Sequence, residues 1–194
     1  ADDGVDTVDY SGAGKVRLEA PRPGPPHVTA DFIARYASGK DHLFSIEHIA
    51  WDERSDHLSI GPGVGIASPP VRIDFGGEHP FGKGDVIDLT AADVGFEIVS
   101  GEERTLNFTA RVPWSGGEAH VLTVRGAEWI VGSPHGDSFV LPNGMRGVEG
   151  GAGDDIFDLR AAERMFVSPG GGENTVIVGD GEIMARSGAG TDRY

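Results

Sequence analysis

The sequence predicts an all-β protein built from stacked coils, a parallel β-roll or β-helix. Three observations favour this fold class. A short glycine-rich phrase recurs near the C-terminus, glycine makes up 31 of 194 residues, and short apolar stretches alternate with turn residues. The glycine share is roughly twice the average of about 7%. A phrase that returns at a fixed spacing indicates repeated coils and not a mixed globular fold.

The clearest copy of the phrase is GGAGDDIFD at Gly150–Asp158, which fits the nonapeptide G-G-x-G-x-D-U-x-x, where U is a large apolar residue. One position of the phrase recurs at spacings of 18, 19 and 18 residues, at Asp137, Asp155, Asn174 and Asp192. Each is followed two residues later by an apolar or aromatic residue: Phe139, Phe157, Val176 and Tyr194. The spacing equals two nonapeptides for each coil.

Each residue type in the phrase has a physical role. Glycine turns the backbone tightly with positive φ and leaves carbonyl groups exposed. The aspartate supplies a hard anionic oxygen, and the apolar residue two positions later points inward from a short strand. We therefore predict an inner apolar ladder, made of Phe139, Phe157, Phe166 and Val176.

In these residues the chain resembles the hemolysin-type calcium-binding repeats of RTX proteins. The resemblance implies a right-handed parallel β-roll, with Ca²⁺ held in the glycine-rich turns by backbone carbonyls and by the aspartate of each repeat. Carried over residue by residue, the implied metal ligands are Asp137, Gly150, Gly151, Ala152, Gly153, Asp155, Gly170, Gly172, Asn174 and Asp192. Because Asn174 is neutral and offers one oxygen, the site on its side is expected to be weaker.

Fainter copies lie upstream of the clear phrase. The pattern D-x-x-D followed by a large apolar or aromatic residue occurs at Asp6–Tyr10, Asp85–Leu89 and Asp155–Leu159. A glutamate also stands nine residues before an aspartate in two places, Glu47 to Asp56 and Glu128 to Asp137. Nine residues is half a coil. We therefore divide the chain into a degenerate β-helix-like region at 1–125, with inserted loops and hairpins, and RTX-like coils at 126–194.

The inserted elements can be placed in order along the chain. Ala20–Pro26 is proline-rich and predicts a loop, because proline cannot pair inside a sheet. Thr29–Ser38 begins with a capping threonine and has apolar residues at helical spacing, which predicts one short helix. From Phe96 to Gly126, alternating stretches are separated by turns at Ser100–Glu103 and Trp114–Glu118, which predicts hairpins.

The net charge of the chain limits the classes of partner that it can bind. The net charge is −15 and no run of lysine or arginine exists, so nucleic acid and anionic membrane surfaces are expected to be poor partners. No segment has the roughly 20 apolar residues needed to span a bilayer. Carboxylates that repeat on every coil would stand roughly 4.8 Å apart and repel each other unless a cation lies between them. The chain is therefore expected to fold poorly without calcium.

Calcium also predicts the compartment. Extracellular modules bind calcium at about 10⁻⁴ to 10⁻³ M, so such a site is filled outside the cell and empty in the cytosol. We expect a calcium-binding structural module of a secreted or cell-surface protein. Its expected partners are calcium ions and the rest of a larger parent polypeptide, with extracellular polysaccharide as a further candidate.

Two alternatives stay open. Parallel β-helices host polysaccharide lyases and epimerases, for which Asp52, His57, Asp88 and Asp93 are the candidate residues here. The chain contains no zinc-ligand spacing, nucleophile elbow or phosphate loop, so we expect no catalytic site. The other alternative is a carbohydrate-binding adhesive module that uses tryptophan rings, although the apolar pattern around Trp129 favours a core position for it. The tryptophans are Trp51, Trp114 and Trp129.

Overall fold

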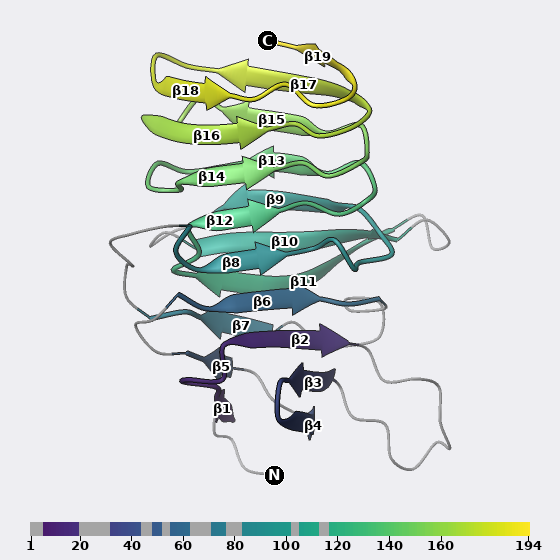
Figure 1. The fold of residues 1–194 in the computed structure, drawn as a ribbon, viewed down its shortest axis with the longest axis vertical. Coiled ribbons are helices and arrows are strands. Elements are labelled where there is room, and N and C mark those ends of the chain that lie inside the picture. Colours follow the sequence, from purple (N-terminus) through teal and green to yellow (C-terminus); the bar gives the residue numbers. More distant parts are fainter. Residues whose placement is uncertain are drawn as a thin grey trace.

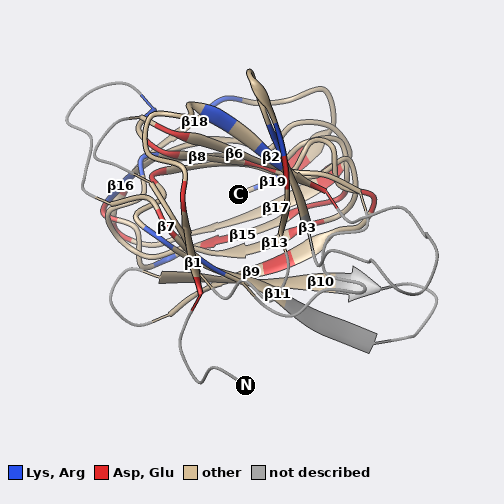
Figure 2. Cartoon of the chain, turned by 90° about the horizontal axis from the view of Figure 1, so that it is seen from below, with Lys and Arg blue, Asp and Glu red and all other residues tan. Residues whose placement is uncertain are grey.

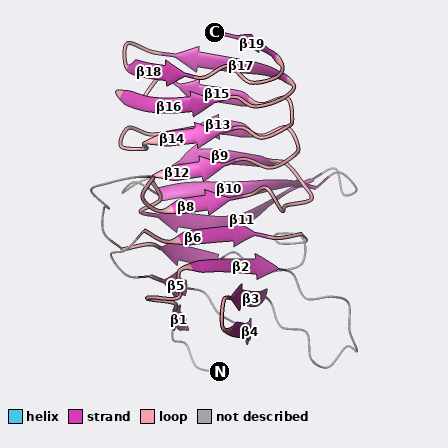
Figure 3. Cartoon of the chain, viewed as in Figure 1, coloured by secondary structure: helices cyan, strands magenta, loops and turns pink. Residues whose placement is uncertain are grey.

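The computed structural model describes residues 6–19, 32–43, 48–51, 55–62, 71–76, 83–101, 105–112 and 117–194. In this part of the chain all regular elements are strands, and they form two sheets that face each other along a long stack (Figures 1 and 3). The described residues contain no helix that could cross a bilayer. The all-β prediction is therefore confirmed.

The two sheets hold nineteen described strands. Sheet A has ten strands, in the spatial order β1 (Thr7–Asp9), β5 (His48–Ala50), β7 (Val71–Asp74), β11 (Gly117–Arg125), β10 (Thr105–Val112), β9 (Phe96–Ser100), β13 (Ser138–Val140), β15 (Ile156–Leu159), β17 (Glu173–Val178) and β19 (Thr191–Arg193). Sheet B has nine, in the order β18 (Glu182–Ala185), β16 (Arg164–Ser168), β14 (Gly147–Glu149), β12 (Trp129–Val131), β8 (Val86–Asp88), β6 (His57–Ile60), β2 (Lys15–Glu19), β3 (Phe32–Tyr36) and β4 (Gly39–Leu43).

From β12 to β19 the chain alternates strictly between the two sheets. Each of these strands pairs in parallel with the strand one coil earlier, so that every coil adds one strand to each sheet. Figure 2, which looks along the stack, shows the strands of the two sheets on opposite sides. The nine-residue spacing between Glu128 and Asp137 therefore does carry the chain from one sheet to the other.

The inner ladder follows this register. Phe139 is the partner of Phe157, and Phe157 is the partner of Val176, with the two phenyl rings stacked 4.9 Å apart. All three side chains are buried in the core. The prediction for Phe166 is wrong. Its side chain lies on the outer face of sheet B, because the alternation in β16 points Met165 and Val167 inward instead.

The D-x-x-D pattern marks one recurring type of strand end, found in sheet A after β1 and β15 and in sheet B after β8. Asp9, Asp88 and Asp158 each accept a hydrogen bond from the backbone N–H two residues later, at Ser11, Thr90 and Arg160 respectively. An alanine stands three residues after the apolar position. Its backbone N–H donates to the carbonyl of the apolar residue, as Ala92 does to Leu89. Such Asx-type bonds end a strand in a tight turn. The upstream copies are thus strand ends of the same geometry.

The inserted hairpins are confirmed. β9 pairs antiparallel with β10, and β10 pairs antiparallel with β11, with a register shift between Phe108 and Thr109. Parallel ladders continue on both sides of this insert, since β7 pairs with β11 and β9 pairs with β13. The hairpins therefore extend sheet A without breaking the stack.

The predicted short helix at Thr29–Ser38 is wrong for its described residues. Residues 32–36 form β3, which pairs antiparallel with β2 and, through a two-residue turn, with β4. The edge of β2 offers unpaired backbone groups along a whole strand, and satisfying them outweighs the weak helical spacing of a ten-residue segment. Residues 29–31 and the loop predicted at 20–26 lie outside the described residues.

One apolar core runs the length of the stack between the sheets. Near the N-terminal end it contains an aromatic cluster, in which Trp51 lies 5.9 Å from Tyr10 and 5.2 Å from Phe75. At the C-terminal end the core is open, since the side chain of Val178 is 45% exposed although it continues the inward row of Leu159. The coils are therefore best enclosed in the middle of the stack.

Candidate functional site

Four side chains of the repeated phrase stack one above another beside sheet A. Asp137 and Asp155 directly precede β13 and β15, while Asn174 and Asp192 are the second residues of β17 and β19 and are partners in register. Asp137, Asp155 and Asn174 are each only 1% exposed. We call these four residues the sheet A ladder. The sequence prediction that they occupy consecutive coils is correct.

Each side chain of this ladder accepts a hydrogen bond from the coil that precedes it in the sequence. The Oδ1 atom of Asp155 accepts the backbone N–H of Asp137 at 2.8 Å, and Oδ1 of Asn174 accepts the N–H of Asp155 at 2.9 Å. The Nδ2 group of Asn174 donates to Oδ1 of Asp192 at 3.0 Å, and Asp137 accepts the N–H of Phe96 at 2.7 Å. The side chains thus satisfy buried amides that would otherwise lack an acceptor.

Asp155 differs from its neighbours in how its second oxygen is used. Oδ2 of Asp137 accepts the N–H of Ser133 at 2.7 Å, whereas Oδ2 of Asp155 is buried and has no hydrogen-bond partner. Burial is the main cause that raises the pKa of Asp155 to about 7; the hydrogen bond from Asp137 opposes this rise, and the charges of Asp137 and Asp154 add to it. This carboxylate is poorly compensated when it is ionised.

The glycine-rich turns stack so closely that side chains cannot be accommodated at several positions. A Cβ atom on Gly151 would overlap the carbonyl oxygen of Ser133, and one on Gly170 would overlap the carbonyl oxygen of Gly151. Gly151 and Gly170 also have positive φ, at 110° and 92°. The glycines are thus required by the stacking itself, and they leave a column of carbonyl oxygens along the turns.

Two oxygen atoms lie close to the Cα atom of Gly150. A Cβ atom on this residue would overlap both Oδ2 of Asp155 and the carbonyl oxygen of Pro169. Beside these turns is a hollow of about 160 Å³, lined by Thr90, Gly132, Ser133, Pro134, Gly151 and Ala152. A carboxylate and backbone carbonyls are the donors that hard cations such as Ca²⁺ prefer. The carboxylate of Asp155 and the backbone carbonyls of these turns are therefore ligands of the kind that such an ion binds.

The remaining predicted ligands are only partly gathered. All ten lie within the described coils, but the carbonyls of Gly151, Gly170 and Gly172 each accept a backbone N–H from the next coil. Asn174 uses its amide oxygen and its amide nitrogen in hydrogen bonds. Within the described ranges, no three His, Cys, Asp or Glu side chains come together as a metal-holding group. The ladder therefore offers one side chain per coil, not a carboxylate cluster.

A second ladder lies on sheet B and was not predicted. Oδ1 of Asp85 accepts the N–H of Asp56 at 2.8 Å, and Oε2 of Glu128 accepts the N–H of Asp85 at 2.6 Å. All three side chains are buried. We call them the sheet B ladder. The signals in the sequence were the position of Asp85 in the D-x-x-D pattern and the nine-residue spacings of Glu47 to Asp56 and of Glu128 to Asp137.

Asp85 also carries a raised pKa. Burial is the main cause that raises it to about 7, the N–H of Asp56 opposes the rise, and the charges of Glu128 and Asp56 add to it. The positive charge of Arg146 lowers it. Arg146 lies one coil after Glu128, and its backbone N–H donates to the carbonyl of Glu128 at 2.9 Å. An arginine of the chain itself thus offsets part of the charge of this ladder.

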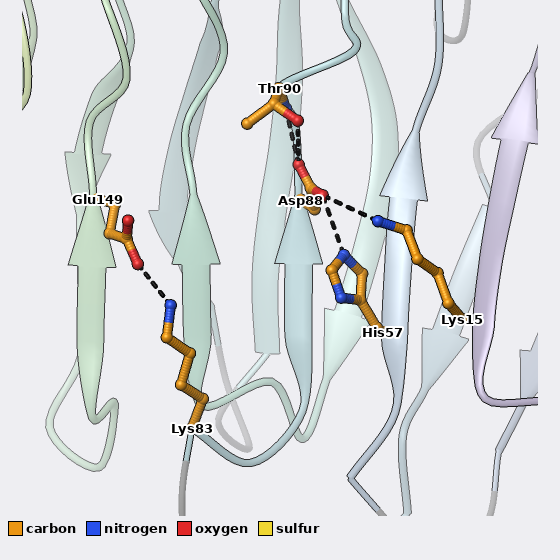
Figure 4. Close-up of polar contacts among 6 residues, drawn as sticks. All are labelled: Lys15, His57, Lys83, Asp88, Thr90 and Glu149. Carbon is orange, nitrogen blue, oxygen red and sulfur yellow. Dashed lines mark hydrogen bonds and ion pairs between the residues drawn. The ribbon is translucent and has the colours of Figure 1, made fainter.

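The outer face of sheet B carries ion pairs (Figure 4). Oδ2 of Asp88 lies 3.0 Å from Nε2 of His57 and 3.4 Å from Nζ of Lys15. The hydrogen bond from His57 is the main cause that keeps the pKa of Asp88 well below its usual range; hydrogen bonds from Thr90 add to this, and burial opposes it. Of the candidate catalytic residues, His57 and Asp88 are therefore together. Asp93 lies apart on an exposed turn, and Asp52 lies outside the described residues.

The tryptophans do not form one cluster. Trp51 is buried in the core, and Trp114 lies outside the described residues. The core position expected for Trp129 is wrong, because its ring lies on the outer face of sheet B above Gly147, where a Cβ atom would overlap it. Its Nε1 donates to Glu149 at 2.9 Å, Nζ of Lys83 lies 4.4 Å from the ring centroid, and Phe166 stacks at 5.6 Å.

Comparisons with known proteins add no relative. No protein-family model, no curated protein and no solved structure matches this chain.

Proposed function

We propose that this chain is a calcium-binding structural module of a secreted or cell-surface protein, and that its coils form a right-handed parallel β-roll. The strict alternation between two sheets from β12 to β19, with parallel pairing one coil apart, supports this architecture. The repeat of two nonapeptides per coil is the length that such a roll needs.

One observation carries the proposal. Oδ2 of Asp155 is a buried carboxylate oxygen without a hydrogen-bond partner, and both it and the carbonyl oxygen of Pro169 lie 2.3 Å from the position that a Cβ atom on Gly150 would take. A buried charge is costly unless a proton or a counter-ion compensates it. At neutral pH, where the proton is partly lost, a divalent cation would supply the missing charge. Calcium suits this position because it accepts six to eight oxygen ligands in flexible geometry.

The residues assigned to the ion follow from the stacking. Asp155 would provide the anionic oxygen, and the carbonyls of Gly150, Ala152, Gly153 and Pro169 would provide neutral ones, since those of Gly151, Gly170 and Gly172 already accept a backbone N–H from the next coil. Asp137 and Asn174 are already engaged in hydrogen bonds, so we assign them to holding the coils in place. A bound ion would therefore link two successive turns, which couples metal binding to folding.

The same reasoning predicts a protein that responds to extracellular calcium. Without the ion, the ionised Asp155 destabilises the coils; with it, the turns are fixed. At a calcium concentration ten times Kd, one site that binds only the folded state adds about 1.4 kcal/mol to the free energy of unfolding. Sites with Kd of about 10⁻⁴ to 10⁻³ M would be filled at millimolar calcium.

Thermal unfolding followed by far-ultraviolet circular dichroism, during a calcium titration with magnesium as the control, tests this proposal. We expect the midpoint to rise with calcium and to change much less with magnesium, because magnesium demands a rigid octahedron. The Asp155→Asn variant should lose the calcium response while keeping the acceptor for Asp137. A β spectrum and an unfolding midpoint that neither calcium nor a chelator changes would defeat the proposal.

A further inference from the structure

Three basic side chains line one hollow on the outer face of sheet B. The hollow has a volume of about 380 Å³ and lies over β2 and β3, where its lining consists of Lys15, Arg17, Arg35, Tyr36 and Ala37. None of the described residues that line it is acidic. The basic side chains are 58%, 39% and 48% exposed in that order. In a chain with 31 acidic and 16 basic residues, such a gathering of cations is unusual.

The register places like charges opposite one another. Arg17 on β2 is the direct partner of Arg35 on β3, an arrangement that destabilises a sheet unless an anion compensates it. A single carboxylate, that of Glu19, serves both arginines. Its Oε1 lies 3.1 Å from Nε of Arg17, and its Oε2 lies 2.7 Å from Nε of Arg35. Two positive charges therefore share one negative charge.

A third cation stands two positions along β2. Lys15 is the direct partner of His57, and Asp88 is the carboxylate that both contact (Figure 4). Among the described residues around the hollow, cations thus outnumber their carboxylate partners. An anion from outside the chain would complete the balance.

The arginines retain donors for such an anion. Both contact Glu19 through Nε, so that the terminal amino groups of each guanidinium can serve as further donors. A guanidinium presents its N–H groups in a planar fork that matches a carboxylate or a sulfate. Two forks that meet at one hollow are well placed to hold one planar or tetrahedral anionic group.

We propose that this hollow binds an anionic sugar, with its carboxylate or sulfate group against Arg17 and Arg35 and its ring against the stems of the basic side chains. The hollow is larger than one inorganic anion needs and falls within the usual range for small-molecule sites. The stems of the basic residues and the methyl group of Ala37 give the ring an apolar surface. The ring of Tyr36 packs inward, against Tyr10 and the core. The site is separate from the sheet A ladder and does not depend on the calcium proposal.

Electrostatics favour a short ligand. The whole chain carries −15, so a long polyanion would be repelled by the remaining acidic surface. Charges further away than about 8 Å are largely screened at physiological salt. A single acidic sugar, or the end of an oligosaccharide, would therefore experience mainly the local cations.

Protein-observed NMR titrations of the full chain, in calcium, with glucuronate, glucose 6-sulfate and glucose test the proposal. We expect at least one of the two anionic sugars to bind about tenfold more tightly than glucose, and to shift the resonances of Arg17, Arg35 and Tyr36. The stronger of the two identifies the carboxylate or the sulfate as the preferred group. Equal binding of glucose, or no shift at these residues with either anionic sugar, would overturn it.

Matched variants locate the site. Arg35→Gln and Arg17→Gln each leave one arginine on Glu19, so both should fold while binding the anionic sugar about tenfold more weakly. Arg160→Gln is the control, because Arg160 is exposed and pairs with Asp158 at the end of β15 in sheet A, whereas the hollow lies over β2 and β3 of sheet B. Loss of binding in Arg160→Gln to the same extent as in Arg35→Gln would also overturn the assignment.

Discussion

The two ladders make the same hydrogen bond but balance their charge differently. In each, a buried side-chain oxygen accepts the backbone N–H of a ladder residue one layer away, as Asp155 does for Asp137 and Asp85 does for Asp56. On sheet B, Arg146 lowers the pKa of Asp85 and offsets part of the acidity. On sheet A, no arginine or lysine is among the groups that shift the pKa of Asp155.

Oδ2 of Asp85 and Oδ2 of Asp155 are both buried without a hydrogen-bond partner, so the charge of Arg146 is what differs between the two sides. On the sheet B side, the described residues show one stacked pair of glycines, Gly76 and Gly126. The sheet A ladder has a column of stacked glycine turns, with carbonyl oxygens along them and a small hollow at Gly151 and Ala152. The same backbone bond is therefore compatible with two solutions, an internal arginine or an external cation. The predictions below test that contrast.

The largest expected effect comes from removing the ladder bond itself. Asp155→Ala leaves the N–H of Asp137 buried without its acceptor and a cavity next to the core, so we expect a loss of about 3 kcal/mol in chelator. Asp155→Asn keeps the acceptor, as Asn174 does in the next coil, and should be at least as stable as the parent. Urea unfolding measures both.

Asp158→Ala is the matched control for Asp155→Ala. Its carboxylate points outward to the exposed Arg160, so its loss should cost less than about 1 kcal/mol. Equal stability of Asp155→Ala and Asp158→Ala would show that the ladder bond contributes nothing measurable.

The glycine turns allow a sharper test of stacking. Gly150→Ala would place a methyl group on Oδ2 of Asp155 and on a backbone carbonyl, so we expect a loss of about 2 kcal/mol or more. Gly171 belongs to the same phrase one coil later, but a Cβ there meets nothing closer than 3.6 Å. Gly171→Ala should therefore change the free energy of unfolding by less than about 1 kcal/mol. Similar losses in both variants would contradict the stacked turns.

The pH dependence of stability reports both ladders together. The pKa values of Asp85 and Asp155 are raised to about 7 in the folded chain, against about 3.9 when unfolded. The folded state therefore binds more protons between pH 4 and 7, and stability falls as pH rises through this window. In chelator we expect a loss of about 1 to 2 kcal/mol between pH 5 and pH 8.

Replacing both aspartates by asparagine should flatten this profile, because neither side chain then titrates. Urea unfolding midpoints at pH 5, 6, 7 and 8 provide the comparison. A parent protein that gains stability over this range would show that the two buried carboxyls are ionised without cost.

The smallest expected effect concerns the internal cation. Arg146→Met removes the positive charge beside Asp85 and should lower stability at pH 8 by about 1 kcal/mol, with less effect at pH 5, where Asp85 is protonated. Arg160→Met, on the exposed corner, should show no such pH-dependent difference. Identical profiles for the two variants would remove the distinction between the ladders.

The sheet A ladder could be predicted from the sequence because its spacing is almost constant and its glycines are explicit. The sheet B ladder could not. Its members are a mixture of aspartate and glutamate, and they stand 29 and 43 residues apart because insertions interrupt the coils. The periodicity that reveals a repeat is lost when loops of different length are added, even though the layers still stack.

The other errors have local causes. Trp129 and Phe166 read as core residues because they are large and apolar, but Gly147 between them leaves room for their rings on the outer face. The helix expected at 29–38 depended on local spacing alone, whereas the available edge of β2 decided the outcome. In both cases a neighbouring strand, distant in sequence, determined the structure.

Hydrogen–deuterium exchange with and without calcium tests the central claim most directly. We predict that calcium slows exchange in peptides covering Gly150–Asp155 and Pro169–Asn174 more than in those covering Asp56 and Asp85. Exchange that calcium leaves unchanged at the sheet A turns, or slows only around the sheet B ladder, would contradict the assignment of calcium to these turns.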